Sequence, residues 1–154
     1  DIVKSVHESI KTSGVKLSEI KSLGIGTPGM IDYDTGSVIY NNNLGWRDFH
    51  LCELINQELK IPVVLENDAD AAALGEVISG SAKGAKSAMI VTLGTGVGSG
   101  FVIGEKIYRG CEFGHMVIHK GGRHCKCGRD GCFESYCSAT AIINITKEKI
   151  SENG

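Results

Sequence analysis

The sequence of 154 residues is poor in aromatic side chains, which make up 6% of it, and contains two prolines. It has no excess of positive charge, because 16 Lys and Arg stand against 18 Asp and Glu, and the formal net charge is −2. Binding to the phosphate backbone of nucleic acid needs a concentrated basic surface, so nucleic acid is not an expected partner. No apolar run approaches the roughly 20 residues that cross a bilayer, and the N-terminus lacks a signal-peptide core, so neither membrane insertion nor export is expected.

Glycine and cysteine, by contrast, are abundant. The 21 glycines indicate several places where the backbone turns tightly or comes close to a ligand. Three of the six cysteines, Cys125, Cys127 and Cys132, lie within eight residues, and the first two are too close along the chain for an unstrained disulfide. Metal ligation is therefore the better interpretation, and it favours a reducing, cytoplasmic compartment over a secreted disulfide scaffold.

The hydrophobic pattern alternates between helical and extended segments and predicts an α/β fold. Asp48 and Ser138 are the expected N-caps of two of the helices. A hairpin is expected over residues 30–40, and a loop over residues 41–46. The remaining predicted elements are helices over residues 1–11, 48–60, 68–77 and from 139 onward, and strands over residues 22–26, 63–65, 87–93 and 101–108.

The strongest chemical signal is a set of metal-ligand residues that contains the three clustered cysteines. Three thiolates and one imidazole form a closed tetrahedral zinc site, which is structural because no coordination position remains for a substrate. His115, His119 and His124 are all candidates for the fourth ligand, and spacing alone does not choose among them. The alternative is that the thiols are simply buried free cysteines.

A glycine-rich turn is expected between the strands over 87–93 and 101–108. Backbone N–H groups that are not hindered by Cβ atoms suit the phosphates of a nucleotide. The pattern matches neither G-x-G-x-x-G nor a Walker motif, so a Rossmann fold and a P-loop are disfavoured, and a tight hairpin without a ligand is the alternative. The candidate phosphate-binding residues are Gly94, Thr95, Gly96, Val97, Gly98, Ser99 and Gly100.

Asn67 and Asp68 stand where an apolar strand passes into a helix, which is where ligands collect in open α/β sheets. A carboxylate there could accept a proton from a hydroxyl nucleophile, while the amide orients the same substrate. The alternative is that Asp68 or Asp70 caps the helix. Glu112 and Glu134 flank the metal segment, where solvated surface acids are also common.

Five motifs occur in one order in this chain, at residues 24–29, 66–69, 93–100, 112–115 and 125–134. The most specific of them are E-x-G-H and the following C-x-C-G-x-x-G-C-x-E. Together the motifs resemble the ROK family of sugar kinases, most closely its bacterial glucokinases. The resemblance covers nearly the whole chain.

The resemblance implies the actin-like, ribonuclease-H-like ATPase fold, with two lobes that close around sugar and ATP and a zinc-binding insertion. Residues 1–84 would belong to the N-terminal lobe, residues 85–154 would start the C-terminal lobe, and residues 79–86 would form the hinge. The implied activity is ATP-dependent phosphorylation of a hexose, chiefly of glucose to glucose 6-phosphate. Relatives of this kind are expected to be cytoplasmic homodimers.

The resemblance also implies roles for single residues. Asp68 would be the catalytic base, and His115 would complete the zinc site. The glycine turn would bind the phosphates of ATP, with Mg²⁺ carried in by the nucleotide. Zinc would order the segment that bears the two acidic sugar ligands. The implied sugar-binding residues are Gly29, Asn67, Asp68, Glu112, His115 and Glu134.

The sequence departs from the family pattern in three ways. It contains no Asp-x-Gly-Gly-Thr motif, it ends before the C-terminal helices of the family, and it is shorter between Gly110 and Glu112. We therefore expect a fragment with little or no kinase activity of its own. Two other classes compete with the kinase: a sugar-responsive transcriptional repressor of the same family, and a zinc-binding interaction module. The repressor is disfavoured because residues 1–30 contain no basic, helix-turn-helix-like segment.

Overall fold

The computed structural model describes residues 2–41 and 44–153. Their contacts define two compact units, Asp1–Asp68 and Ala69–Gly154. The lobes expected over residues 1–84 and 85–154 remain a prediction.

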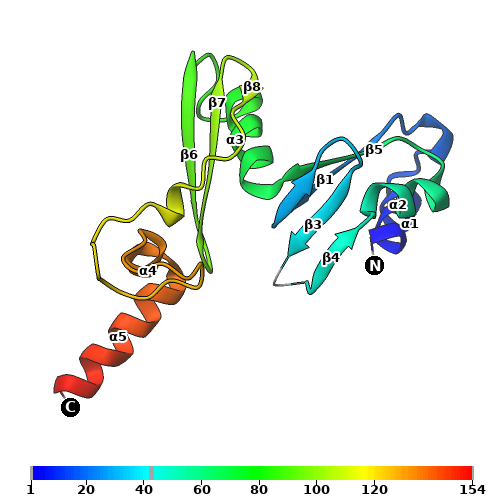
Figure 1. The fold of residues 1–154 in the computed structure, drawn as a ribbon. Helices are drawn as coiled ribbons and strands as arrows, with labels where there is room; N and C mark the ends of the chain where they lie inside the picture. The colour runs from blue at the N-terminus through cyan, green and yellow to red at the C-terminus, as the bar shows by residue number, and fades with distance from the viewer. Residues whose placement is uncertain (1, 42–43, 154) are drawn as a thin grey trace. The chain divides into compact units, whose positions relative to one another are not determined.

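The first unit contains two small sheets (Figure 1). Strands β1 (Leu23–Thr27) and β5 (Val63–Asn67) pair in parallel, with Thr27 opposite Asn67. Three strands form an antiparallel meander, which confirms the predicted hairpin over its first two: β2 (Met30–Asp32), β3 (Ser37–Asn41) and β4 (Trp46–Phe49).

Helix α2 (Leu51–Leu59) supplies much of the core of this unit. Its apolar residues Leu51, Ile55 and Leu59 recur every four positions, and all three are buried. They pack in one cluster with Val38 and Leu65. Helix α1 (Ile2–Ser13) and the short 3-10 helix η1 (Leu17–Glu19) add partly buried side chains to its edge.

The predicted loop over residues 41–46 is one residue too long at each end, and the predicted cap at Asp48 is wrong. Asn41 still belongs to β3, β4 begins at Trp46, and Asp48 lies inside this strand with φ 46°. Contacts across and along the strands hold this conformation: the rings of Trp46 and Phe49 stack at 4.6 Å, and the Arg47 guanidinium lies 4.7 Å from the centre of the Tyr40 ring. Helix α2 therefore begins after His50. Residues 42 and 43 of the predicted loop lie outside the described residues.

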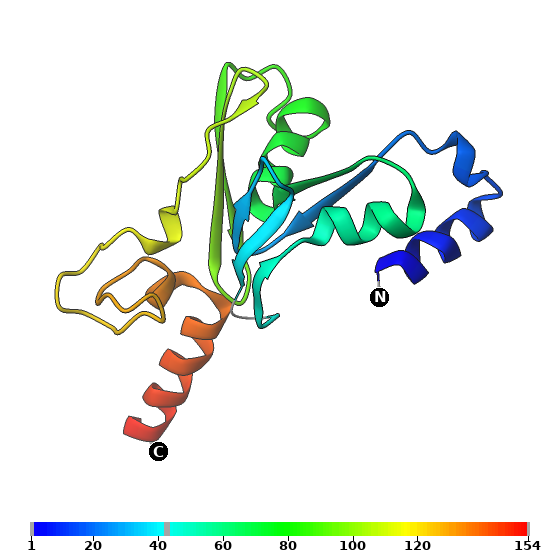
Figure 2. The ribbon, with the colours of Figure 1, turned by 45° about the vertical axis from the view of Figure 1, so that its right-hand side comes forward.

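The second unit is built on an antiparallel sheet with helix α3 (Asp68–Ser79) packed against it (Figures 1 and 2). The predicted strand over 87–93 is confirmed as β6, and its partner is β7, with Leu93 opposite Val97. The sheet consists of β6 (Ser87–Leu93), β7 (Val97–Ile103) and β8 (Lys106–Ile107).

The turn between β6 and β7 is shorter than the sequence predicts, because β7 already begins at Val97. Two of the glycines face α3 instead of the turn. A Cβ atom on Gly98 would lie 3.1 Å from the Cβ atom of Ala69, and one on Gly100 would lie 2.5 Å from that of Ala73. These glycines therefore allow the helix to approach the strand closely.

The cysteine-rich segment lies in the chain between η2 (Phe113–His115) and α4 (Glu134–Cys137), and α5 (Ala139–Asn153) follows. The Ser138 hydroxyl accepts a hydrogen bond from the N–H of Ala141 at 3.0 Å, so the predicted cap is confirmed. Arg123 forms a bidentate ion pair with Glu148 of α5. Within the described residues, no helix has both the length and the hydropathy to cross a bilayer.

Candidate functional site

The structure brings the four predicted metal ligands together. One donor atom each from His115, Cys125, Cys127 and Cys132 lies within 4.8 Å of all the others. The Sγ atoms of Cys127 and Cys132 are 3.6 Å apart, and the Sγ of Cys125 is 3.7 Å from Nδ1 of His115. A tetrahedral site with Zn–S bonds of about 2.3 Å has sulfur atoms about 3.8 Å apart, so the donor set fits zinc.

Tight turns form this cluster from a short stretch of sequence. The N–H of Gly128 donates to the carbonyl of Cys125 at 2.9 Å, and the N–H of Cys125 donates to the carbonyl of Arg129 at 2.8 Å. Gly128 has φ 87°, a left-handed conformation that a glycine adopts without strain. The side chain of Arg129 lowers the pKa of the Cys127 thiol to about 6, which favours the thiolate that a metal requires. Burial raises the pKa of the Cys132 thiol.

The two rival histidines have other partners. Nδ1 of His119 lies 3.2 Å from the Tyr136 hydroxyl, and Nδ1 of His124 lies 2.9 Å from a carboxylate oxygen of Asp130. Both histidine side chains are exposed. Geometry thus singles out His115 where spacing left three candidates.

Glu134 links the metal segment to the glycine turn. Its Oε2 accepts a hydrogen bond from the N–H of Val97 at 2.8 Å, and its Oε1 lies 4.0 Å from the Sγ of Cys125. A side chain on Gly96 would collide with the same carboxylate. The predicted sugar ligand and the predicted phosphate turn are therefore in direct contact.

Strand β7 also anchors the segment that carries Glu112. The buried hydroxyl of Ser99 donates to the carbonyl of Cys111 at 2.6 Å and accepts from the N–H of Phe113 at 3.0 Å. A Cβ atom on Gly114 would collide with the carbonyl of Val97, so this position needs a glycine. Ser99 thus binds the residues directly before and after the exposed Glu112. Ser99 belongs to the predicted phosphate turn, but its hydroxyl is engaged here.

Asn67 and Asp68 lie at the carboxyl end of the parallel strand pair, at the last residue of β5 and the first of α3. The register of β1 and β5 places the turn with Gly29 at the same end. Gly29 has φ 104°, and a Cβ atom there would collide with the carbonyl of Tyr40. The side chain of Asn41, which is 3% exposed, donates to the carbonyl of Pro28 at 2.5 Å and braces this turn.

The sequence analysis missed Asn41 and Thr140 as polar side chains that support the predicted site. The Thr140 hydroxyl donates to the carbonyl of Thr95 at 2.8 Å. No pattern in the sequence connects these two threonines, which are 45 positions apart. The available local signal was only that Thr140 follows the helix cap Ser138.

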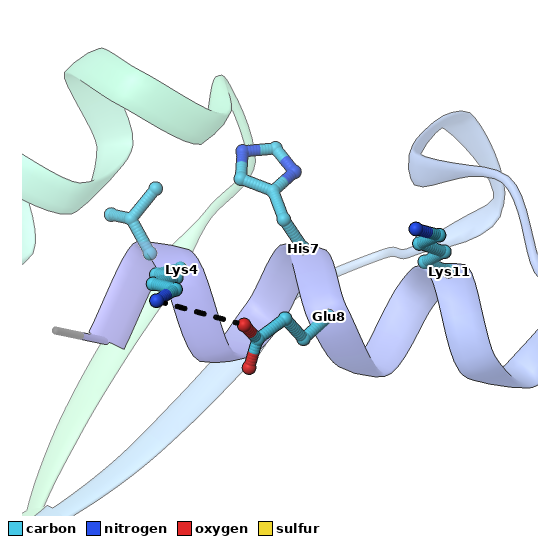
Figure 3. A pocket seen from close by; sticks show the side chains of 5 residues that line it. Lys4, His7, Glu8 and Lys11 are labelled. Atoms are coloured by element: carbon cyan, nitrogen blue, oxygen red, sulfur yellow. Dashed lines mark ion pairs between the residues drawn. The ribbon is translucent and has the colours of Figure 1, made fainter.

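A surface hollow of about 420 Å³ lies on α1 and is lined by none of the predicted site residues (Figure 3). Its lining residues all belong to α1, and the exposed side chains of Lys4 and Glu8 form an ion pair at 3.9 Å. Such an exposed pair contributes little to stability. The hollow brings together no groups from different elements, and we assign it no role.

The strands and helices form an α/β fold, and the four clustered donors form a Cys₃His set that could hold a metal ion. The model of the ROK family matches residues 1–153. The chain belongs to the ROK family, and the predicted family and fold class are confirmed.

Named relatives include both enzymes and regulators. The chain is 44% identical over 142 residues to a glucokinase of Halalkalibacterium halodurans, a match that covers 88% of this chain and 43% of that protein. It is 36% identical over 155 residues to the xylose repressor of Bacillus subtilis, covering 96% of this chain and 40% of that protein.

Among solved structures, it resembles a ROK family glucokinase from Streptomyces griseus in complex with glucose and AMPPNP, with a TM-score of 0.79 and 35% identity. That match covers 98% of this chain and 50% of the other. The chain thus spans about half the length of these relatives or less.

Proposed function

We propose that this chain supplies the catalytic base, sugar-binding residues and one phosphate-binding turn of an ATP-dependent hexose kinase, with glucose as the favoured substrate. The observation that carries this proposal is its similarity, over nearly its whole length, to a glucokinase structure that contains glucose and AMPPNP. The full protein would be cytoplasmic and dimeric, and it would need neither a membrane nor nucleic acid.

Asp68 would accept the proton of the attacking sugar hydroxyl. As the proton moves to the carboxylate, the hydroxyl oxygen forms a bond to the γ-phosphorus of ATP, and the bond from this phosphorus to the bridging oxygen breaks to release ADP. Asn67 offers both a donor and an acceptor, so it would orient the same hydroxyl. This reaction depends on alignment and charge neutralisation more than on covalent catalysis, so the task of these two side chains would be to orient and deprotonate the attacking hydroxyl.

The other predicted ligands would bind the remaining hydroxyls. The carboxylates of Glu112 and Glu134 accept hydrogen bonds from hydroxyl groups. Nδ1 of His115 faces Cys125, so only its second ring nitrogen is available to a sugar. The backbone at Gly29 would line the pocket, since no side chain is tolerated there.

Two metal ions would support this chemistry. The Cys₃His donors would hold zinc as a structural cross-link, and Mg²⁺ would come with the nucleotide to offset the charge of its phosphates. The glycine turn over residues 94–100 would receive those phosphates through backbone N–H groups.

An ADP-release assay on the full-length protein with a panel of hexoses tests the proposal. We expect turnover with glucose, and a loss of at least about 100-fold in kcat for Asp68→Asn, because general-base catalysis contributes factors of this size or more. Asp34→Asn, in the exposed hairpin turn between β2 and β3, is the matched control and should leave kcat unchanged. Nearly intact turnover in Asp68→Asn would show that another group is the base.

A sugar-responsive repressor is the second candidate, and the similarity to the xylose repressor favours it. If the protein is a repressor, calorimetry should show that it binds a sugar, but the sugar and ATP together should give no ADP. A zinc-binding interaction module would give no heat with any sugar of the panel.

A further inference from the structure

The tip of the glycine hairpin is held by the segment that follows the metal ligands. Two backbone carbonyls of the tip each accept a hydrogen bond from the first turn of α5. The N–H of Ala139 donates to the carbonyl of Gly94 at 2.9 Å, and the Thr140 hydroxyl donates to the carbonyl of Thr95 at 2.8 Å. Two residues further on, the N–H of Val97 donates to the carboxylate of Glu134 at 2.8 Å.

These two bonds determine where the N–H groups of the tip point. In a trans peptide, the C=O and the N–H of one planar unit point in opposite directions. The carbonyl of Gly94 points toward α5, so the N–H of Thr95 points away from it. The carbonyl of Thr95 also points toward α5, so the N–H of Gly96 points away as well. Two successive N–H groups on one side of a turn form a site for an anion.

The end of α5 that makes these contacts is itself fixed. Ser138 caps the helix through the N–H of Ala141 at 3.0 Å. Farther along, Glu148 pairs with Arg123 of the metal segment. Toward its start, α5 is linked through α4 to the predicted metal ligand Cys132. Phe133, the residue after Cys132, donates its N–H to the carbonyl of Met116, the residue after His115, at 2.9 Å. The helix that holds the hairpin tip is thus attached to the metal segment both through Glu148 and through the chain that follows Cys132.

We propose that Thr140 is a positioning residue for nucleotide phosphates: its hydroxyl fixes the Thr95–Gly96 peptide and aims the N–H of Gly96 at the phosphate. This inference rests on the proposed kinase function. Of the two bonds from α5, only that of Thr140 comes from a side chain, so only it is removed by a substitution.

The test compares Thr140→Val, which keeps the shape but loses the hydroxyl, with Thr140→Ser, which keeps the hydroxyl. Thr146→Val, on the same helix, is the matched control. In the full-length protein, we expect Thr140→Val to raise KM for ATP by about three- to tenfold, the range that follows from the loss of one ordinary hydrogen bond. KM for the hexose should change less than twofold. Thr140→Ser should restore KM for ATP to near the wild-type value.

Hydrogen exchange gives a readout that does not depend on activity. With ATP bound, the amides of Thr95 and Gly96 should be protected from exchange less in Thr140→Val than in the wild type or Thr146→Val. If the wild type shows no phosphoryl transfer, the proposed kinase function is wrong. The role of Thr140 is then tested by hydrogen exchange during a titration with ATP.

Unchanged exchange, or an increase in KM for ATP no larger than in Thr146→Val, would overturn the inference. Should Thr140→Val fail to fold, Thr140→Ala provides the same comparison, with the same results for and against.

Discussion

A single methyl group added at Gly100 tests the close packing of α3 on the sheet. The new Cβ atom would lie 2.5 Å from the Cβ atom of Ala73 and 2.7 Å from the carbonyl oxygen of Ala69. Carbon atoms in contact are about 3.5–4.0 Å apart, so helix and strand must separate by about 1 Å. Both Ala73 and Val102, which belong to this packed cluster, are fully buried. Overpacking of such a region costs about 1–3 kcal/mol.

A smaller effect opposes this cost. Replacing glycine by alanine restricts the unfolded chain and stabilises a protein by about 0.4–1 kcal/mol where the folded backbone tolerates it. The net expectation for Gly100→Ala is therefore a loss of about 1–2 kcal/mol in the free energy of unfolding. Gly94→Ala is the matched control, because among the described residues no atom lies within 4 Å of its added Cβ.

Urea denaturation, followed by circular dichroism, measures both variants. Gly100→Ala should unfold at a lower urea concentration than the wild type with an unchanged slope, whereas the midpoint of Gly94→Ala should stay level or rise. If Gly100→Ala were as stable as Gly94→Ala, the glycines of β7 would not be needed for packing.

Two further predictions concern the metal segment and its anchor. Native mass spectrometry should find one zinc ion in the wild type and in the control Cys52→Ser, and none in Cys125→Ser or after treatment with a chelator. In Cys125→Ser, the loss of the ion should also speed hydrogen exchange between residues 115 and 132. Zinc retained by Cys125→Ser would refute the ligand set. Ser99→Ala removes a buried hydroxyl and leaves the carbonyl of Cys111 and the N–H of Phe113 without this partner, which should cost about 1–3 kcal/mol of stability and raise KM for the sugar through Glu112. Ser87→Ala, at the exposed start of β6, should change the stability by less than about 0.5 kcal/mol. Equal stability of the two serine variants would contradict the anchoring role.

Elements with a local cause were predictable from the sequence. The apolar stripe of α2 places Leu51, Ile55 and Leu59 on one face, and nothing distant is needed to recognise it. Ser138 is a helix cap by its side chain alone. The metal cluster was predictable for the same reason, since three of its four ligands lie close together in the sequence.

Features that depend on distant partners were not predictable. β4 exists because Trp46 and Arg47 pair with residues of β3, and these pairings override the preference of Asp48 for a helix cap. The choice of His115 over His119 depends on which imidazole the folded chain brings to the three thiols, and no spacing reveals this. The same holds for Thr140 and its partner Thr95.

The run of glycines in β7 was partly misread, and the reason lies in the period of a strand. Side chains alternate between two faces, so Gly98, Gly100 and Val102 face α3, while Val97 and Ser99 face the other way. The face toward α3 needs the absence of side chains at Gly98 and Gly100, and the other face needs the hydroxyl of Ser99 for the segment that carries Glu112. In the sequence Val-Gly-Ser-Gly, the two glycines thus serve the face of β7 that packs on α3, and the valine and the serine serve the opposite face.

This alternation constrains how the site could change. A shift of β7 by one residue would place Ser99 against α3 and remove the anchor of Glu112 at the same time. The hydrogen bond from Val97 to Glu134 would be lost in the same step, and with it one brace of the glycine turn. The predicted phosphate turn and the two predicted acidic sugar ligands are therefore positioned by one strand register, and a change that moves one of them must move the others.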